Sequence, residues 1–195
     1  MPLLDRGDAT LTRGLLLAIA VVAPVLLVGL PLLDWVRGEP LVWAGAVDRQ
    51  GEVPGAVAGS TVRWNGGVDV TVDGAPAGLW LLTLATGVVL ALAVVAVALL
   101  LRRVVGDVRA GRPFTQQGLR ALRGVGLVVA SASILVPVLD GVATSAVLDH
   151  AVADDGLSLA IDFSPLWLLA GVLVLVVAEA FRHGLELTHD VDGLV

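Results

Sequence analysis

Four long runs of apolar residues that contain no charged side chain divide the chain. The first two runs hold 20 and 28 residues and the last two hold 16 each: Gly14–Leu33, Gly74–Leu101, Gly124–Leu139 and Phe163–Ala178. A helix needs roughly 20 residues to cross the hydrocarbon core of a bilayer. The first two runs are long enough alone, and the last two are flanked by residues that can complete a helix. The pattern therefore predicts four transmembrane helices at about 12–34, 78–103, 120–141 and 164–184.

The composition leads to the same class of protein. Hydrophobic residues make up 57% of the 195 positions and charged residues only 15%, and the mean hydropathy is +0.92. A soluble domain could not solvate so apolar a surface, and the length leaves little chain for a separate soluble domain. We expect one membrane domain over residues 1–195: an all-α, four-transmembrane-helix bundle.

The first apolar run has a second interpretation, as a secretory signal peptide. Arg6 and Arg13 would form its charged region, and Ala44-Gly45-Ala46 resembles a cleavage site. The apolar region of a signal peptide spans about 7–15 residues, however, with cleavage close behind it. Here the run is longer and the triplet lies well beyond its end. The pattern favours an uncleaved first helix.

The distribution of arginine predicts the orientation, because positive charge collects on the cytoplasmic side of a membrane protein. The segment 102–123 carries six arginines and the two terminal segments carry three more, whereas the segments 34–78 and 140–162 carry three arginines and 11 acidic residues. Both termini and the hairpin loop 104–119 should face the cytoplasm. Loops 35–77 and 142–163 should face outward. We expect a multi-pass protein of the cell (plasma) membrane.

Tryptophan agrees with this orientation, and two other compositional features limit function. Trp35, Trp80 and Trp167 fall at the predicted outer ends of spans, where an amphipathic ring is favoured. The net charge of −6 argues against direct binding of nucleic acid. The absence of cysteine excludes thiolate-held zinc and iron–sulfur clusters, and we expect no cofactor.

The first outer loop contains a β-hairpin signal. Residues 61–64 and 68–72 flank Asn65-Gly66-Gly67, a sequence typical of a tight hairpin turn. Residues 157–161 alternate and 41–47 form a weaker strand candidate. We predict a small extracytoplasmic β-hairpin cap. Such a cap could bind a ligand, but it more commonly ties helix ends together.

The basic segment 102–123 should form a helical hairpin. Gly111 and Pro113 are typical of a helix end, and Thr115 can cap the helix that follows. Phe114 would lie at the tip. Two interpretations stay open: a loop that contacts anionic lipid, or a docking site for a cytoplasmic protein.

The spans themselves are poor in polar chemistry. Their charge-free cores hold no ionisable residue, which weighs against a proton-coupled transporter. Gly126, Ala130 and Ser133 form a small-residue stripe that favours close helix packing. Pro24, Pro31 and Pro137 predict kinks in the first and third helices.

The C-terminal tail is a weak candidate for a metal site. Glu179, His183, Glu186 and Asp190 would share one face of a helix, and such side chains can bind a divalent metal. A solvated face in which Glu179 pairs with Arg182, or with Arg102 or Arg103, is favoured instead. No nucleophile elbow or catalytic triad can be identified, so we predict that the chain is not an enzyme.

Two segments resemble the bacterial membrane family known as domain of unknown function 2975. They are GDVRAGRPFTQQGLRALRGVG at 106–126 and AEAFRHGLELTHDVDGLV at 178–195. In that family a Gly-x-Pro-Phe element joins helices two and three, and an Ala-Glu-x-Phe segment ends helix four. The family has no established activity. The resemblance implies a bacterial membrane protein encoded near a small helix-turn-helix regulator, and hence a cytoplasmic partner.

Our functional hypothesis is a non-enzymatic membrane protein that holds or regulates a cytoplasmic partner such as that regulator. The candidate docking residues are Arg109, Arg112, Pro113, Phe114, Glu179, Phe181 and Glu186. The alternative is an oligomeric channel or small-solute transport component, and a homo-oligomer is compatible with either. The lipid bilayer is a partner in both.

The predicted orientation can be tested by labelling, since the chain has no cysteine of its own. Single cysteines replacing Gly66 and Gly111 should react with an impermeant maleimide from opposite sides of the membrane in intact cells and inverted vesicles. Reaction of both from the same side would contradict the arginine-based topology.

Overall fold

The computed structural model divides the chain into two compact units. Unit 1 comprises Met1–Ala23, Leu92–Ser133 and Ser164–Val195, and unit 2 comprises Pro24–Ala91 and Ile134–Phe163. The structure describes all residues except 1–5, 46, 49–56, 65–67, 110–114, 153–157, 160, 162 and 193–195, and it also leaves undescribed the side chains of 6–10, 47, 48, 63, 64, 68, 109, 158, 159 and 183–192.

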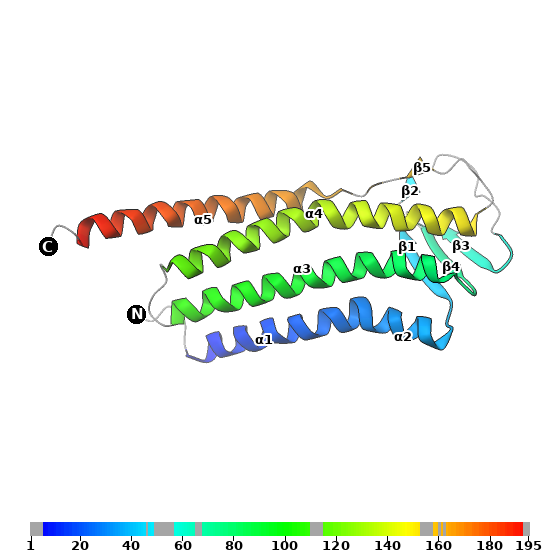
Figure 1. Cartoon of the computed structure of the whole chain (residues 1–195), viewed down its shortest axis with the longest axis horizontal. Coiled ribbons are helices and arrows are strands. Elements are labelled where there is room, and N and C mark those ends of the chain that lie inside the picture. The colour runs from blue at the N-terminus through cyan, green and yellow to red at the C-terminus, as the bar shows by residue number, and fades with distance from the viewer. Residues whose placement is uncertain are drawn as a thin grey trace. The chain divides into compact units, whose positions relative to one another are not determined.

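Most of the described chain is helical (Figure 1). The helices are α1 (Arg6–Pro24), η1 (Val25–Gly29), α2 (Leu30–Arg37), α3 (Ala77–Arg109), α4 (Gln116–Ala151) and α5 (Pro165–Asp192). Four stretches of them are long and apolar enough to cross a membrane: Leu11–Arg37, Ala77–Val108, Gln116–Ala151 and Pro165–Arg182. The predicted set of four membrane-crossing helices is confirmed at this level.

The helices extend beyond the predicted spans, most of all at the end of α4. This helix was expected to end at 141, but it continues to Ala151, so the predicted outer loop 142–163 starts about ten residues later. Ala143, Val147 and Ala151 have exposed fractions of 0%. Their spacing of four residues is the helical repeat. The extra turns therefore form because their apolar face packs into the core of unit 2, whereas the sequence interpretation ended the span near Asp140.

The first helix changes its hydrogen bonding at its prolines. Residues Val25–Gly29 form a π-helical turn, in which the Leu30 N–H donates to the Val25 carbonyl five residues earlier. Pro31 follows at once and has no N–H to give to the Leu27 carbonyl. The irregularity predicted from Pro24 and Pro31 thus takes the form of a π-turn between two α-helices.

The strands form a three-stranded antiparallel sheet in the order β1-β4-β3. The sheet contains β1 (Leu41–Gly45), β3 (Ser60–Trp64) and β4 (Val68–Val72), and a separate pair joins β2 (Val47–Asp48) to β5 (Ser158–Leu159). The predicted hairpin is confirmed, because Thr61 pairs with Thr71 and Trp64 with Val68. The weaker candidate at 41–47 contributes the third strand, so the hairpin is one part of a larger sheet.

The core of unit 2 lies where this sheet meets helix ends (Figure 1). Its buried members are Leu41, Val70 and Val72 from the sheet, Leu79 and Trp80 from α3, and Val147, Leu148, Ala151 and Val152 from α4 and the residue after it. The rings of Trp35 and Trp80 stack with centroids 6.1 Å apart. Trp43 Nε1 donates to Thr144 Oγ1 at 3.0 Å. The sheet is therefore fixed to both α3 and α4.

In unit 1, α4 and α5 pack through residues that lack bulk. A Cβ added to Gly171 would lie 2.7 Å from the Ala130 backbone nitrogen, and one added to Gly126 would lie 2.7 Å from Leu175 Cγ. Both distances are shorter than van der Waals contact, so only glycine fits. The small-residue stripe predicted from Gly126 and Ala130 is confirmed as a packing surface.

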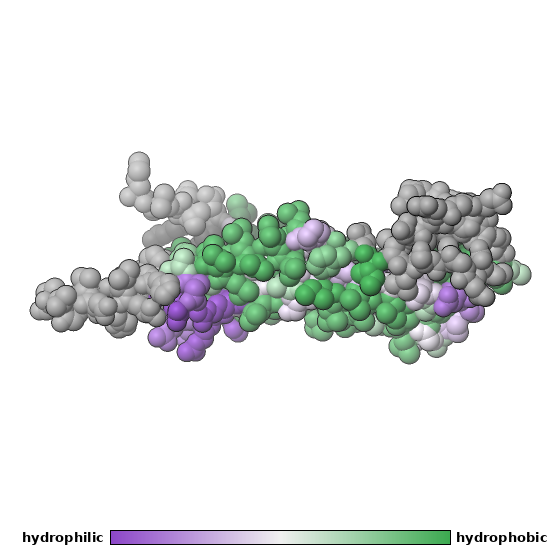
Figure 2. Space-filling view, turned by 90° about the horizontal axis from the view of Figure 1, so that it is seen from above, coloured by the Kyte–Doolittle hydropathy of each residue, from purple (hydrophilic) through white to green (hydrophobic). Residues whose placement is uncertain are grey.

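The outward surface of the helices is hydrophobic. Figure 2 shows one face, where hydrophobic residues cover much of the described helices and hydrophilic residues gather in separate groups beside them. Large apolar side chains such as Leu92, Leu166 and Leu173 are more than half exposed. An exposed apolar surface of this kind is expected where a protein contacts lipid.

The close approach of α4 and α5 leads to a stability prediction. Gly171→Ala should lower the thermal unfolding temperature in detergent, because the new methyl group must push against the Ala130 backbone, which costs about 1–3 kcal/mol. Gly14→Ala is the matched control, since nothing lies within 4 Å of the added Cβ and alanine favours a helix by up to about 1 kcal/mol. An equal effect of the two substitutions would contradict this packing.

Candidate functional site

The end of α3 and the start of α4 are joined by hydrogen bonds of one threonine. The Thr115 hydroxyl accepts from the Gly118 N–H at 2.9 Å and donates to Asp107 Oδ2 at 2.7 Å. The predicted N-cap is confirmed. Asp107 is the one acidic residue of the segment 102–123, and its carboxylate is used to join the end of α3 to the start of α4.

Five of the described arginines of unit 1 form two groups, and the first group is paired. Arg123 of α4 contacts Glu179 of α5 at 2.6 Å, and Glu179 also contacts Arg182 at 2.5 Å. Glu179 thus pairs with Arg182 as predicted, and its partner on another helix is Arg123 rather than Arg102 or Arg103. Such half-exposed pairs add little stability, but they neutralise Arg123.

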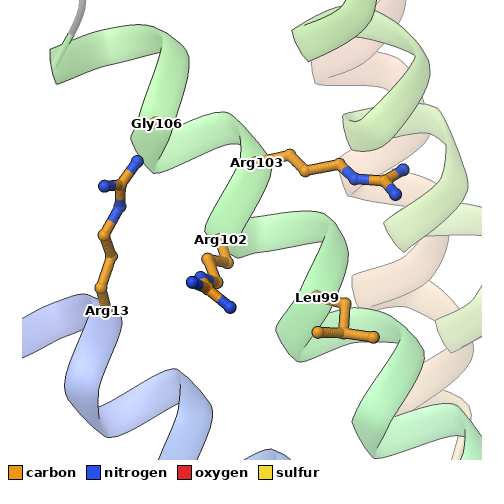
Figure 3. Close-up of a pocket in the computed structure, with 5 residues that line it drawn as sticks. All are labelled: Arg13, Leu99, Arg102, Arg103 and Gly106. Atoms are coloured by element: carbon orange, nitrogen blue, oxygen red, sulfur yellow. The ribbon is translucent and has the colours of Figure 1, made fainter.

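The second group of arginines surrounds a cavity of ≈ 410 Å³. Its lining residues are Arg13, Leu99, Arg102, Arg103 and Gly106 (Figure 3). Arg13 reaches from α1 to Gly106 on α3, Arg102 extends into the same space, and the Arg103 side chain extends to the other side of α3 (Figure 3). The cavity therefore has two guanidinium groups on one side of α3.

Gly106 makes this arrangement sterically feasible. A Cβ at this position would lie 2.6 Å from a terminal guanidinium nitrogen of Arg13, so any larger residue would displace that side chain. Arg13 Nε is buried, and it has no hydrogen-bond partner among the described residues. No carboxylate lines the cavity.

Two guanidinium groups beside one cavity suit an anion. The planar fork of arginine matches carboxylate and phosphate groups, and charge-assisted hydrogen bonds to them are about twice as strong as neutral ones. Among the described residues no group of three or more metal-ligating side chains occurs. The proposed metal face of the tail includes His183, Glu186 and Asp190, whose side chains are not described.

The predicted docking residues are only partly described. Arg109 is the last residue of α3 and Glu186 lies within α5, both without described side chains, whereas Arg112, Pro113 and Phe114 lie outside the described residues. Glu179 is paired, and Phe181 is 40% exposed. Sequence reasoning used Arg13 for the signal-peptide alternative and for orientation but not as a site residue, because nothing in the sequence indicates that α1 packs beside Gly106.

The comparisons with known proteins agree with the sequence resemblance. A family model described as "Protein of unknown function (DUF2975)" matches residues 49–195. The match includes both segments that carry the resemblance. No curated protein and no solved structure shows significant similarity to the chain.

The capped turn leads to a prediction about its stability. Thr115→Val removes the hydroxyl while keeping the shape of the side chain, and loss of such a cap costs about 1 kcal/mol. The unfolding temperature should fall, and limited proteolysis between α3 and α4 should become faster. Thr61→Val on the exposed side of β3 is the control and should change neither. Unchanged stability of the Thr115 variant would mean that the cap contributes nothing.

Proposed function

Since the chain belongs to the DUF2975 family, we propose that it is a non-enzymatic multi-pass protein of the cell membrane that holds a cytoplasmic regulatory protein. The surface that carries this proposal is the arginine-lined cavity of unit 1. Its expected partner is an acidic surface of that protein, and the family resemblance implies a small helix-turn-helix regulator.

The main support is the division of the arginines. Arg123 and Arg182 share Glu179, whereas Arg13 and Arg102 line a cavity that contains no carboxylate. Like charges on one surface repel one another. An arriving anion relieves this repulsion and gains charge-assisted hydrogen bonds, so these two arginines favour the binding of an acidic partner.

The neighbouring residues suit a protein partner. Leu99 adds an apolar wall to the cavity and is 44% exposed. Interface hot spots typically combine arginine with apolar or aromatic anchors. The sequence places Arg112 and Phe114 in the same basic segment as Arg102, so the binding surface would extend from the cavity to the tip of the hairpin.

A lipid phosphate presents the same chemistry as an acidic side chain, so the experiment must separate the two. The double variant Arg13→Gln with Arg102→Gln removes two of the three lining arginines and keeps Arg103, whose guanidinium group extends to the other side of α3. Arg37→Gln, an exposed arginine at the end of α2, is the matched control. Full-length proteins are purified from native membranes, and bound proteins and lipids are quantified by mass spectrometry.

We expect wild type and the Arg37 variant to retain the same acidic cytoplasmic protein, and the double variant to lose at least about 90% of it. Two charge-assisted contacts of about 1.5–3 kcal/mol each predict a loss of this order. Equal recovery of the protein by all three would contradict the proposal. Loss of anionic lipid alone would assign the cavity to a membrane contact.

The hairpin tip gives a second test of the same surface. Phe114→Ala with Arg112→Ala should leave membrane insertion intact, since it spares Arg102, Arg103, Arg120 and Arg123 near the ends of the spans. It should abolish recovery of the partner, because loss of an aromatic anchor costs on the order of 2 kcal/mol or more. Retention of the partner by this variant would mean that the tip is only a turn.

A further inference from the structure

A second cavity, of ≈ 320 Å³, lies within unit 2. It is lined by η1 and α2, by β1 and the residue before it, and by α3. Most of its lining is apolar, with Leu26 and Leu84 among the aliphatic residues and Trp43 and Trp80 as the aromatic ones. Its polar side chains are Asp34, Thr83 and Thr86, and no arginine or histidine lines it.

Two contacts hold η1 and α2 against α3, one near each end of this cavity. Near one end, the rings of Trp35 and Trp80 stack. Near the other, Gly87 lies against the Leu27 carbonyl, so closely that a Cβ on Gly87 would overlap the oxygen. Gly87 follows Trp80 by seven positions on α3, which corresponds to about 10 Å along the helix.

Two threonines line the cavity, and they differ in their hydrogen bonding. Thr83 Oγ1 donates to the Leu79 and Trp80 carbonyls, each at 3.1 Å. Thr86 is equally buried, at 7% exposed, but its hydroxyl has no partner among the described residues. A buried hydroxyl without a partner is costly. Thr86 is therefore the group that an occupant of the cavity could satisfy, at the level of the Gly87–Leu27 contact.

Asp34 supplies the charge at the opposite level. It precedes Trp35, so it lies near the Trp35–Trp80 stack, and it is half-buried. Its backbone carbonyl accepts the Glu39 N–H at 3.0 Å, whereas no described cation pairs with its carboxylate. Tryptophan faces also attract cations. A carboxylate and two indole rings beside an apolar cavity favour a positively charged ligand.

We propose that this cavity binds an amphiphilic amine: a cationic head at Asp34, an apolar body, and a hydrogen-bonding group that reaches Thr86. The Trp35–Trp80 stack and the Gly87–Leu27 contact lie about 10 Å apart along α3. The cationic head of the ligand and its hydrogen-bonding group should therefore be about 10 Å apart. A phospholipid fits poorly, since no basic side chain in the lining would meet its phosphate. Trp43, held by its bond to Thr144, and Trp80, held by its stack on Trp35, form rigid walls.

The charge at Asp34 is tested with ligands of one length. Full-length protein in phosphatidylcholine nanodiscs is titrated with aminooctanol, octanediol and hydroxyoctanoate, and binding is followed by native mass spectrometry. We expect aminooctanol to bind best. Asp34→Asn should raise its Kd about tenfold, as loss of a charge-assisted contact predicts, and should leave octanediol unchanged. Glu39→Gln, a neighbouring carboxylate outside the lining, is the control and should change neither.

The hydroxyl of Thr86 is tested with a second pair of ligands. Octylamine has the same head as aminooctanol but no distal hydroxyl. Thr86→Val should weaken aminooctanol about fivefold, the effect of one neutral hydrogen bond, and should leave octylamine unchanged. The unfolding temperature without ligand should not fall, because the variant removes a hydroxyl that no described group satisfies. A merely structural role of Thr86 would instead lower that temperature and affect both amines equally.

Two outcomes would overturn the proposal. One is equal binding of the cationic, neutral and anionic ligands by the wild-type protein. The other is an Asp34→Asn effect on octanediol as large as that on aminooctanol, since this would indicate a distorted cavity rather than a lost charge. A phosphate-free amine-bearing lipid that co-purifies with wild type but not with Asp34→Asn would identify the membrane as the source of the ligand. Binding of added aminooctanol alone would identify a solute.

Discussion

Helices in a bilayer gain nothing from hiding apolar surface from one another, because lipid is as apolar as leucine, so their packing depends on how closely they can approach. Glycine sets that approach in both units. Gly87 admits the Leu27 carbonyl, Gly106 admits the Arg13 guanidinium, and Gly171 admits the Ala130 backbone. Gly106 lines the cavity of unit 1, and Gly87 lines the cavity of unit 2. The positions of both candidate sites thus follow from a few missing methyl groups.

Much of this fold could be predicted, because its main determinants are local. The four apolar runs, the Asn-Gly-Gly turn and the Thr115 cap each depend on neighbours in the sequence. The contacts that build the sites are not local. Arg13 meets α3 some 93 residues later, at Gly106, and β1 enters the sheet by pairing with β4. The extension of α4 to Ala151 depends on tertiary burial, because Val147 is buried in the core of unit 2. The local sequence pattern does not indicate this burial.

Charge is arranged differently on the two cavities. In unit 1, arginines line a cavity without a carboxylate, whereas in unit 2 a carboxylate lines a cavity without an arginine. A net charge of −6 conceals this contrast, since it sums opposite local surfaces. In a membrane protein with so few charged residues, the local electrostatic potential therefore depends on which charged side chains lack an ion-pair partner. Glu179 illustrates the opposite case, because it neutralises arginines on two helices at once.

The glycine contacts differ in what they meet, and this difference bears on how the sequence can change over evolutionary time. Gly124 faces the side chain of Leu100, with a Cβ position 3.0 Å from Leu100 Cδ1. A larger residue at 124 can be accommodated if position 100 becomes smaller, so these two positions can vary together. Gly171 faces backbone atoms of Ala130, and Gly87 faces the backbone oxygen of Leu27. A backbone cannot shrink, so no single replacement in the facing helix can compensate at 87 or 171.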